Sequence, residues 1–192
     1  MNLQHVNVRL RIKPVGAAGL EPLIPVFHRW IQGRVFEELL LDIADYRHVP
    51  AGPGVILIGH QADYSVDNTD NVMGVRYNRK MVLDGNNQDR LTQATRSALT
   101  ACQRLETEPT VNGKIQFNGQ DVEVFINDRL AAPNTDSTRE ATKSELNGFF
   151  GKLFHGADFS LSHETDPRRL FGVSAKSSRL FSVADLLRNL AS

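Results

Sequence analysis

The chain has 192 residues, of which 41% are hydrophobic and 23% are charged, and its 22 basic side chains balance 22 acidic ones. This composition predicts one ordinary domain, or at most two small ones that share a core, and such a chain needs neither disulfides nor a structural metal to fold. A formal net charge of zero offers no general attraction to nucleic acid or to an anionic membrane, so we expect neither as a partner.

The N-terminus and the cysteine content bear on the expected cellular location of the protein. Residues 1–5 lack a charged segment followed by an apolar stretch, and no apolar run approaches the ~18 residues that span a bilayer. We therefore expect a cytoplasmic protein. Cys102 is the one cysteine, so no disulfide can form within the chain, and we expect a small buried thiol on a helix rather than a nucleophile.

Turn residues and apolar spacing divide the first half of the chain into strands around one helix. Apolar and polar residues alternate at the start, which is typical of a half-buried strand, and helical spacing follows. Pro50-Ala51-Gly52-Pro53 separates two apolar runs, which predicts a hairpin. The predicted elements are a strand over residues 6–13, a helix over 21–32, a hairpin of 36–46 and 54–64, and a strand over 72–79.

The second half of the chain carries the same kinds of signal. Asn118-Gly119 is a strong type I′ turn dipeptide and predicts a second hairpin. Ser137 with Glu140 three residues later forms a capping box that opens a helix, and Ser182 with Asp185 opens another. The predicted elements are a helix over residues 88–106, a hairpin of 114–117 and 121–127, a helix over 137–156, strands around 159–161 and 171–175, and a helix from 182.

This order of elements predicts an α+β fold, in which a mostly antiparallel sheet carries helices packed on one face. Two ferredoxin-like halves in tandem, residues 1–118 and 119–176, would give the same order. Residues 1–176 then form a single α+β domain, and residues 177–192 form a C-terminal amphipathic helix. We expect that helix to fold back on its own domain, with docking on a partner protein as the alternative.

The first hairpin carries the most informative chemistry. A tight loop centred on Gly52-Pro53 places each residue i opposite residue 105 − i and gathers apolar side chains on one face. That register puts Asp45 opposite His60, with Cβ atoms ~5 Å apart, where a carboxylate can accept a hydrogen bond from an imidazole. Such a pair holds a base in one tautomer, so Asp45 and His60 are the candidate catalytic residues. The alternative is a structural pair that fixes the register.

The same register gathers polar residues on the other face of the hairpin. Asp42 lies opposite Asp63 with His48 nearby, and facing carboxylates are unfavourable unless they are solvated, protonated or bridged by a cation. These three residues are therefore candidate metal ligands, with a solvated sheet edge as the alternative. Tyr46, His48 and Arg76 are candidate ligand-binding residues.

A basic stripe runs along the first predicted strand. Arg9, Arg11 and Lys13 share its polar face, and with Arg76 on a neighbouring strand they would attract an acidic ligand, although a solvated face is the usual explanation. No aromatic residues are interleaved with this stripe for stacking, which argues against single-stranded nucleic acid. Gly16-Ala17-Ala18-Gly19 follows the strand without the pattern of a phosphate-binding loop, so we expect a plain connection.

Two classes of function remain open on this basis. We expect a non-enzymatic binding or assembly protein that self-associates. Leu40, Leu57 and Phe125 are predicted on the otherwise polar face of the sheet, which indicates a homodimer contact or a ligand groove. The alternative is a small hydrolase-type enzyme that uses Asp45 and His60, with or without a metal. The sequence identifies no cofactor and no substrate.

Overall fold

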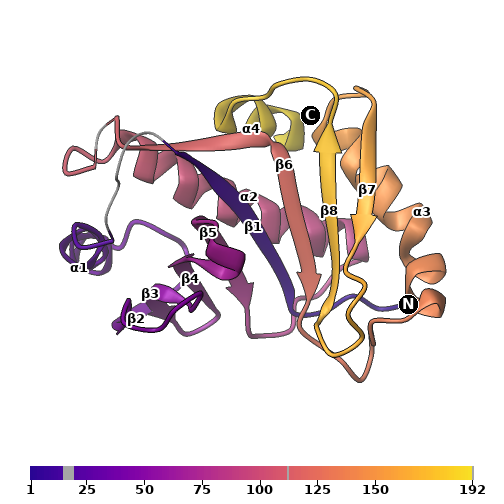
Figure 1. Ribbon diagram of the computed structural model, residues 1–192, viewed down its shortest axis with the longest axis horizontal. Helices are drawn as coiled ribbons and strands as arrows, with labels where there is room; N and C mark the ends of the chain where they lie inside the picture. Colours follow the sequence, from indigo (N-terminus) through magenta and orange to yellow (C-terminus); the bar gives the residue numbers. More distant parts are fainter. Residues whose placement is uncertain (15–19, 112, 192) are drawn as a thin grey trace.

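An eight-stranded antiparallel sheet and four helices make up the part of the chain that the computed structural model describes, residues 1–14, 20–111 and 113–191 (Figure 1). The strands are β1 (Val6–Pro14), β2 (Leu40–Tyr46), β3 (Gly54–Gly59), β4 (Ala62–Asp67), β5 (Gly74–Arg79), β6 (Ile115–Ile126), β7 (Phe159–His163) and β8 (Phe171–Ser177). The helices are α1 (Leu23–Gly33), α2 (Asn87–Thr107), α3 (Asp136–Leu153) and α4 (Val183–Ala191), with a short 3-10 helix, η1 (Thr69–Asn71). The segment Gly16-Ala17-Ala18-Gly19 lies outside the described residues.

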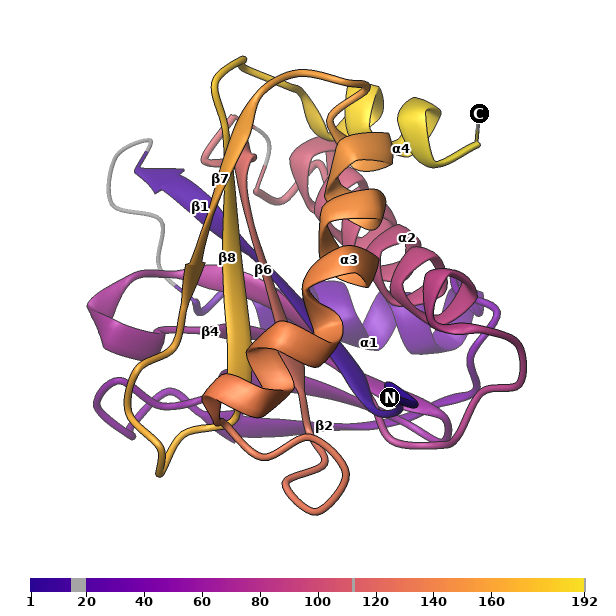
Figure 2. The same ribbon diagram turned by 90° about the vertical axis from the view of Figure 1, so that its right-hand side faces the viewer.

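The helices lie on one side of the sheet and leave its other side, the open face, without a helical cover (Figure 2). The strand order is β2-β3-β4-β5-β1-β6-β8-β7, and every pair of neighbours is antiparallel. The predicted α+β class is confirmed. The tandem ferredoxin-like halves are not confirmed, and the expected boundary at residue 118 falls inside the continuous strand β6.

The core lies between the helices and the facing side of the sheet. Val6, Val8 and Leu10 alternate along β1 and are at most 2% exposed. The long helix α2 packs across β1, β5 and β6, and it begins with a capping box in which Asn86 and Asp89 bond each other's backbone amides. Burying each such aliphatic side chain stabilises the fold by about 1.5–3 kcal/mol, so the alternating pattern is enough to orient the strand.

The predicted first hairpin is wrong in strand number and in register. Residues 54–64 are divided between β3 and β4 by a turn at His60 and Gln61. Tyr46 lies opposite Gly54, five positions from its predicted partner Gly59. Gly54 has a φ of +65°, and a Cβ there would lie 2.0 Å from the carbonyl oxygen of Val66 on β4. Glycine at this position therefore permits the close approach of β3 and β4.

A displacement by an odd number of residues also exchanges the two faces of a strand. Leu57 is fully buried on the helix side of the sheet, and Leu40 is 8% exposed, so neither lies on the polar face as predicted. The predicted register would also group Ile56 with the apolar side chains of one face, but Ile56 lies opposite Ser65 in a row of open-face residues. Ile58 shares the face of Ile56 because it is two residues further along the strand.

The predicted second hairpin is also wrong, because β6 continues through Asn118-Gly119. The register of β6 against β1 shifts between the pairs Leu10–Val122 and Ile12–Phe117, which marks a bulge. Inside it the Asn118 amide donates to Asp121 at 2.8 Å and its oxygen accepts from the backbone of Gln120 at 3.2 Å. The turn-forming dipeptide therefore closes a local loop within one strand instead of reversing the chain.

The helix ends follow short-range capping chemistry. Helix α3 is capped by Thr135, whose hydroxyl accepts from the backbone amide of Thr138 at 3.4 Å, so the predicted cap at Ser137 is two residues late. Ser182 and Asp185 cap α4 as predicted, with the Asp185 amide donating to the Ser182 hydroxyl at 3.1 Å. Helix α4 docks on its own chain against α2, α3 and β6.

None of the helices in the described ranges is both long and apolar enough to cross a bilayer.

Cys102 lies fully buried on α2, as predicted. Burial, with a smaller contribution from Glu106, raises the pKa of its thiol well above the ordinary value. Because the thiolate is the reactive form, we expect Ellman's reagent to label no thiol in the native protein at pH 8 and one thiol per chain in guanidinium. Labelling of the native protein at the rate of free cysteine would contradict this placement.

Candidate functional site: an arginine pocket on the open face

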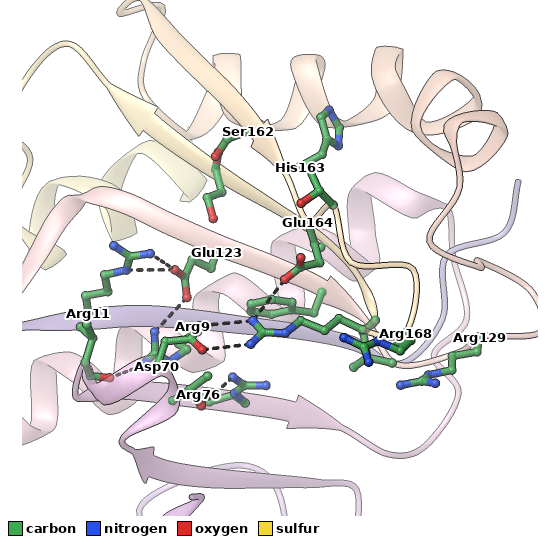
Figure 3. Close-up of a pocket in the computed structure, with 18 residues that line it drawn as sticks. Arg9, Arg11, Asp70, Arg76, Glu123, Arg129, Ser162, His163, Glu164 and Arg168 are labelled. Carbon is green, nitrogen blue, oxygen red and sulfur yellow. Dashed lines mark hydrogen bonds and ion pairs between the residues drawn. The ribbon is translucent and has the colours of Figure 1, made fainter. Parts of the chain in front are cut away.

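A pocket of about 660 Å³ lies on the open face, between η1 on one side and the β7–β8 loop on the other (Figure 3). Phe125 and Val72 contribute apolar surface to it, and most of the remaining lining is charged. Its charged lining residues are Arg9, Arg11, Arg76, Arg129, Arg168, Arg169, Asp70, Glu123 and Glu164. We call this the arginine pocket.

Strand pairing builds the floor of the arginine pocket. Arg9 on β1 lies opposite Arg76 on β5 and opposite Glu123 on β6. Glu123 lies in turn opposite Ser174 on β8, and Ser174 lies opposite Ser162 on β7. Because directly opposite residues in an antiparallel sheet share a face, these side chains form one row across the open face, drawn from strands far apart in the sequence.

Arg9 is the centre of a buried ion-pair network. Its Nε donates to Asp67 Oδ1 at 2.9 Å and its Nη1 donates to Glu123 Oε2 at 3.0 Å. A further nitrogen, Nη2, bonds the carbonyl oxygen of Val72. Arg9, Asp67 and Glu123 are 3%, 2% and 6% exposed, so the network lies beneath the pocket surface. Burial by itself lowers the pKa of Arg9, but Asp67 and Glu123 outweigh it and raise the pKa above its ordinary value.

Two more arginines join the network from its exposed side. Arg11 donates from Nε to Glu123 Oε1 at 2.9 Å, and its side chain is 45% exposed. Arg76 donates to Asp67 Oδ2 at 3.1 Å and lies over the ring of Phe125, 5.0 Å from the centroid. Two carboxylates thus hold three guanidinium groups in fixed positions, which leaves a net positive charge in the floor.

One arginine connects the two sides of the pocket rim. Arg169, from the β7–β8 loop, pairs with Asp70 of η1 at 3.1 Å and with Glu164 at 3.3 Å (Figure 3). Hydrogen bonding from Arg169 lowers the pKa of Asp70. Asp70 and its neighbour Asn71 have φ values of +54° and +58°, in the left-handed region. Aspartate and asparagine tolerate this conformation better than most residues, which lets η1 turn toward the β7–β8 loop.

Two rim arginines have donors left to offer. Arg168 is 88% exposed and pairs with its near neighbour Asp166 at 2.8 Å. Arg129, in the loop after β6, is exposed, and among the described residues its side chain has no partner. In Figure 3 its guanidinium extends toward that of Arg168. Like charges that point toward one another at a pocket mouth are stabilised when an anion lies between them.

Two glycines provide the space that the side chains of Arg9 and Phe125 occupy in the floor of the pocket. A Cβ on Gly74 would lie 2.9 Å from the Arg9 guanidinium, and one on Gly172 would lie 2.7 Å from the Phe125 ring. Both glycines are in the strands that flank these residues, β5 and β8. Side chains at these positions would displace Arg9 or Phe125 from the floor of the pocket.

The structure does not bring together the predicted catalytic pair. Asp45 lies opposite Val55 and pairs with Arg47 at 2.7 Å, and hydrogen bonding from Arg47 lowers the pKa of Asp45 to about 2. His60 is exposed in the turn between β3 and β4. The prediction that these two residues face each other is wrong, because it depended on the displaced register. Their catalytic role stays a prediction without the geometry that suggested it.

The predicted metal ligands are likewise apart in the sheet. Asp42 lies opposite Ile58, whereas Asp63 lies opposite Asn78 and pairs with Lys80 at 2.7 Å. His48 is in the β2–β3 loop, with its ring centroid 6.3 Å from that of Tyr46. Within the described ranges no group of three histidine, cysteine, aspartate or glutamate residues is placed to hold a metal ion.

Of the predicted site residues, Arg76 lies in the arginine pocket. The sequence also placed Arg9 and Arg11 beside it, but the expectation that Arg9 is solvated is wrong, because η1 and its carboxylate partners cover it. The acidic partners were missed. The alternation of Glu123 with Val122 and Val124 could have placed Glu123 on the polar face of its strand. The strand order was needed to show that Glu123 lies opposite Arg9. A comparison of the chain with protein-family models, curated proteins and solved structures found no match.

Proposed function

We propose that this protein is a binding protein that takes a small anionic ligand, such as a phosphate ester or a di- or tricarboxylate, in the arginine pocket. The observation that carries the proposal is the convergence of guanidinium groups from β1, β5, the loop after β6 and the β7–β8 loop on one cavity. Arginine presents planar, bidentate donors that match carboxylate and phosphate oxygens.

The charge balance supports an anion rather than a neutral ligand. Six arginines line the pocket against three carboxylates, and counting Asp67 and Asp166, which pair with them from outside the lining, still leaves an excess of one positive charge. The volume of about 660 Å³ lies in the range of small-molecule sites. Phe125 and Val72 offer apolar contact to the uncharged part of such a ligand.

The floor and the rim have different parts in this proposal. Arg9 has no exposed donor to offer, so it positions Glu123 and, through Asp67, Arg76. Arg129 and Arg168 are the groups that contact the ligand, because they are exposed and incompletely paired. Binding at the rim replaces water on these guanidinium groups with charge-assisted hydrogen bonds, which are stronger than neutral ones.

Calorimetry with inorganic pyrophosphate tests the proposal. We expect binding to the native protein that weakens as salt is added, because the contacts are ionic and exposed. The double substitution Arg129→Gln and Arg168→Gln removes two positive charges from the rim and should weaken pyrophosphate binding about tenfold or more. Both side chains are exposed, so the variant should fold normally.

The charge-matched control is the double substitution Arg34→Gln and Lys114→Gln, at two exposed positions outside the pocket lining whose side chains have no partner among the described residues. We expect this variant to bind pyrophosphate as the native protein does. Equal loss of binding in both variants would indicate a nonspecific charge effect, and no binding to the native protein would exclude this ligand class.

Self-association stays a prediction. The free edge strand β2 and its flanks expose Leu39 (57%), Leu41 (53%) and Tyr46 (42%), which supports a contact between copies. The edge is partly blunted, because the side chain of Asp42 accepts from the outward backbone amide of Ile43 at 2.8 Å. Light scattering of the purified chain distinguishes a monomer from a dimer. The hydrolase alternative draws no support from the register of β2 and β3.

A further inference from the structure

A second cavity, of about 740 Å³, lies on the helix side of the sheet, away from the arginine pocket. It runs between the α1–β2 loop, which provides Glu37 and Glu38, and the polar side of α2, which provides Gln93, Arg96 and Ser97. Lys152 of α3 and Leu190 of α4 also line it. We call this cavity the Glu38 groove.

Glu38 is held in the groove by four neutral donors. Its Oε2 accepts from the Tyr64 hydroxyl at 3.0 Å, and its Oε1 accepts from the Tyr77 hydroxyl at 3.2 Å. Ser97 and the Gln93 amide add weaker bonds to Oε1 at 3.3 and 3.5 Å. Tyr64 and Tyr77 are at most 1% exposed, so the carboxylate is anchored from the core side and reaches the groove from there.

The tyrosines act as hydrogen-bond donors in this arrangement. Burial first, and then the charge of Glu38, raises the pKa of Tyr64, and burial raises the pKa of Tyr77. Both hydroxyls therefore stay protonated and fix the carboxylate in one orientation. Phe36 stacks on Tyr64 with ring centroids 4.5 Å apart, which holds the loop that carries Glu38.

The carboxylate lacks a counter-charge. Among the described residues no lysine, arginine or histidine forms an ion pair with Glu38, although ion pairs are common elsewhere in the chain. A half-buried charge is costly unless it is paired as well as hydrogen-bonded. Oε2 accepts one bond against three at Oε1, so Oε2 is the oxygen with acceptor capacity left for a ligand.

We propose that the Glu38 groove binds a small primary monoamine, whose ammonium group forms the missing ion pair with Glu38. An ammonium ion supplies three donors on a compact charge, which suits a single free carboxylate oxygen at a cavity wall. The rest of the lining carries Arg96 and Lys152 against Glu37 and Asp89, so these charges balance in number and Glu38 leaves one negative charge for a single ammonium group. Val35, Phe36 and Leu190 are the apolar residues of the lining and offer contact to the aliphatic part of the amine.

An NMR titration of the native protein with n-butylamine hydrochloride at pH 7 tests the proposal, with n-butanol as the uncharged probe of the same shape. We expect the ammonium ion to shift the backbone amide signals of Glu38, Gln93 and Ser97 in a saturable manner, and butanol to leave them unchanged. The substitution Glu38→Gln keeps the shape of the side chain and an oxygen for one of the two tyrosine hydroxyls, and it removes the charge. It should weaken butylammonium binding about tenfold or more.

The matched control is Glu37→Gln, which removes the neighbouring exposed carboxylate of the same groove and should change the affinity less than about twofold. Tyr64→Phe is the second variant. It keeps the charge of Glu38 and loses one anchor, so it should bind butylammonium with reduced affinity even if Glu38→Gln fails to fold. No saturable shift in the native protein, equal shifts with butanol, or equal loss in Glu37→Gln would overturn the proposal.

Discussion

Replacing Arg9 by methionine is expected to lower the free energy of unfolding by about 3–5 kcal/mol, which is the usual cost of removing one partner from a buried ion pair. Methionine keeps much of the length of the side chain but leaves Asp67 and Glu123, at 2% and 6% exposure, without their shared cation. Each carboxylate keeps one arginine on the exposed side of the network, Arg76 for Asp67 and Arg11 for Glu123, but loses the buried cation that compensates for its own burial. Urea unfolding followed by circular dichroism measures the difference.

Arg11→Met is the control that isolates burial. Arg11 pairs with the same Glu123, but its side chain is 45% exposed, so water compensates for its loss and we expect a change within about 1 kcal/mol. If the two substitutions cost the same, the network around Arg9 is hydrated and the floor of the arginine pocket is not the rigid base that the proposed function requires.

Replacing Leu186 by alanine is the second large effect, expected at about 2–5 kcal/mol because it opens a cavity in a packed site. Leu186 is fully buried where α4 packs on its own chain, with its Cδ1 3.3 Å from the position that a Cβ on Gly119 would take. The loss should be independent of protein concentration, because the surface that buries α4 belongs to the same chain.

The control for this substitution is Leu180→Ala, just before α4, where the side chain is 77% exposed. We expect a change within about 0.5 kcal/mol. A stability of the native protein that rises with its concentration, together with a small effect of Leu186→Ala, would instead indicate that α4 docks on another copy.

Element types were predictable from the sequence where a local pattern decides them. The alternation along β1, the apolar stripe of α2 and the Ser182–Asp185 cap of α4 depend on residues a few positions apart, and each is found as expected. Turns were less predictable. Asn118-Gly119 has the composition of a reversal, yet its backbone is held in a bulge because β6 pairs with β1 on both sides of it.

The strand register and the geometry of the site could not be predicted from local sequence patterns, because both depend on contacts between strands that are far apart in the chain. The loop between β2 and β3 allows several registers, and its own residues do not select the one in which Tyr46 lies opposite Gly54. The burial of Arg9 depends on carboxylates from β4 and β6 and on the η1 segment above them. The sequence shows that Arg9 lies on a polar face of its strand. Whether that face is exposed to solvent depends on which strands lie beside β1.

The central place of β1 has a consequence for synthesis of the chain. β1 is synthesised before its pairing strands β5 and β6, and the carboxylates that pair with Arg9 lie 58 and 114 residues further along the chain. Until those residues are made, an alternating strand with both edges bare is exposed to other nascent chains, and closing such long loops is slow. Arg9, Arg11 and Lys13 alternate along β1 and carry like charge, so we expect them to disfavour pairing of this strand with a second copy of itself while the chain is incomplete.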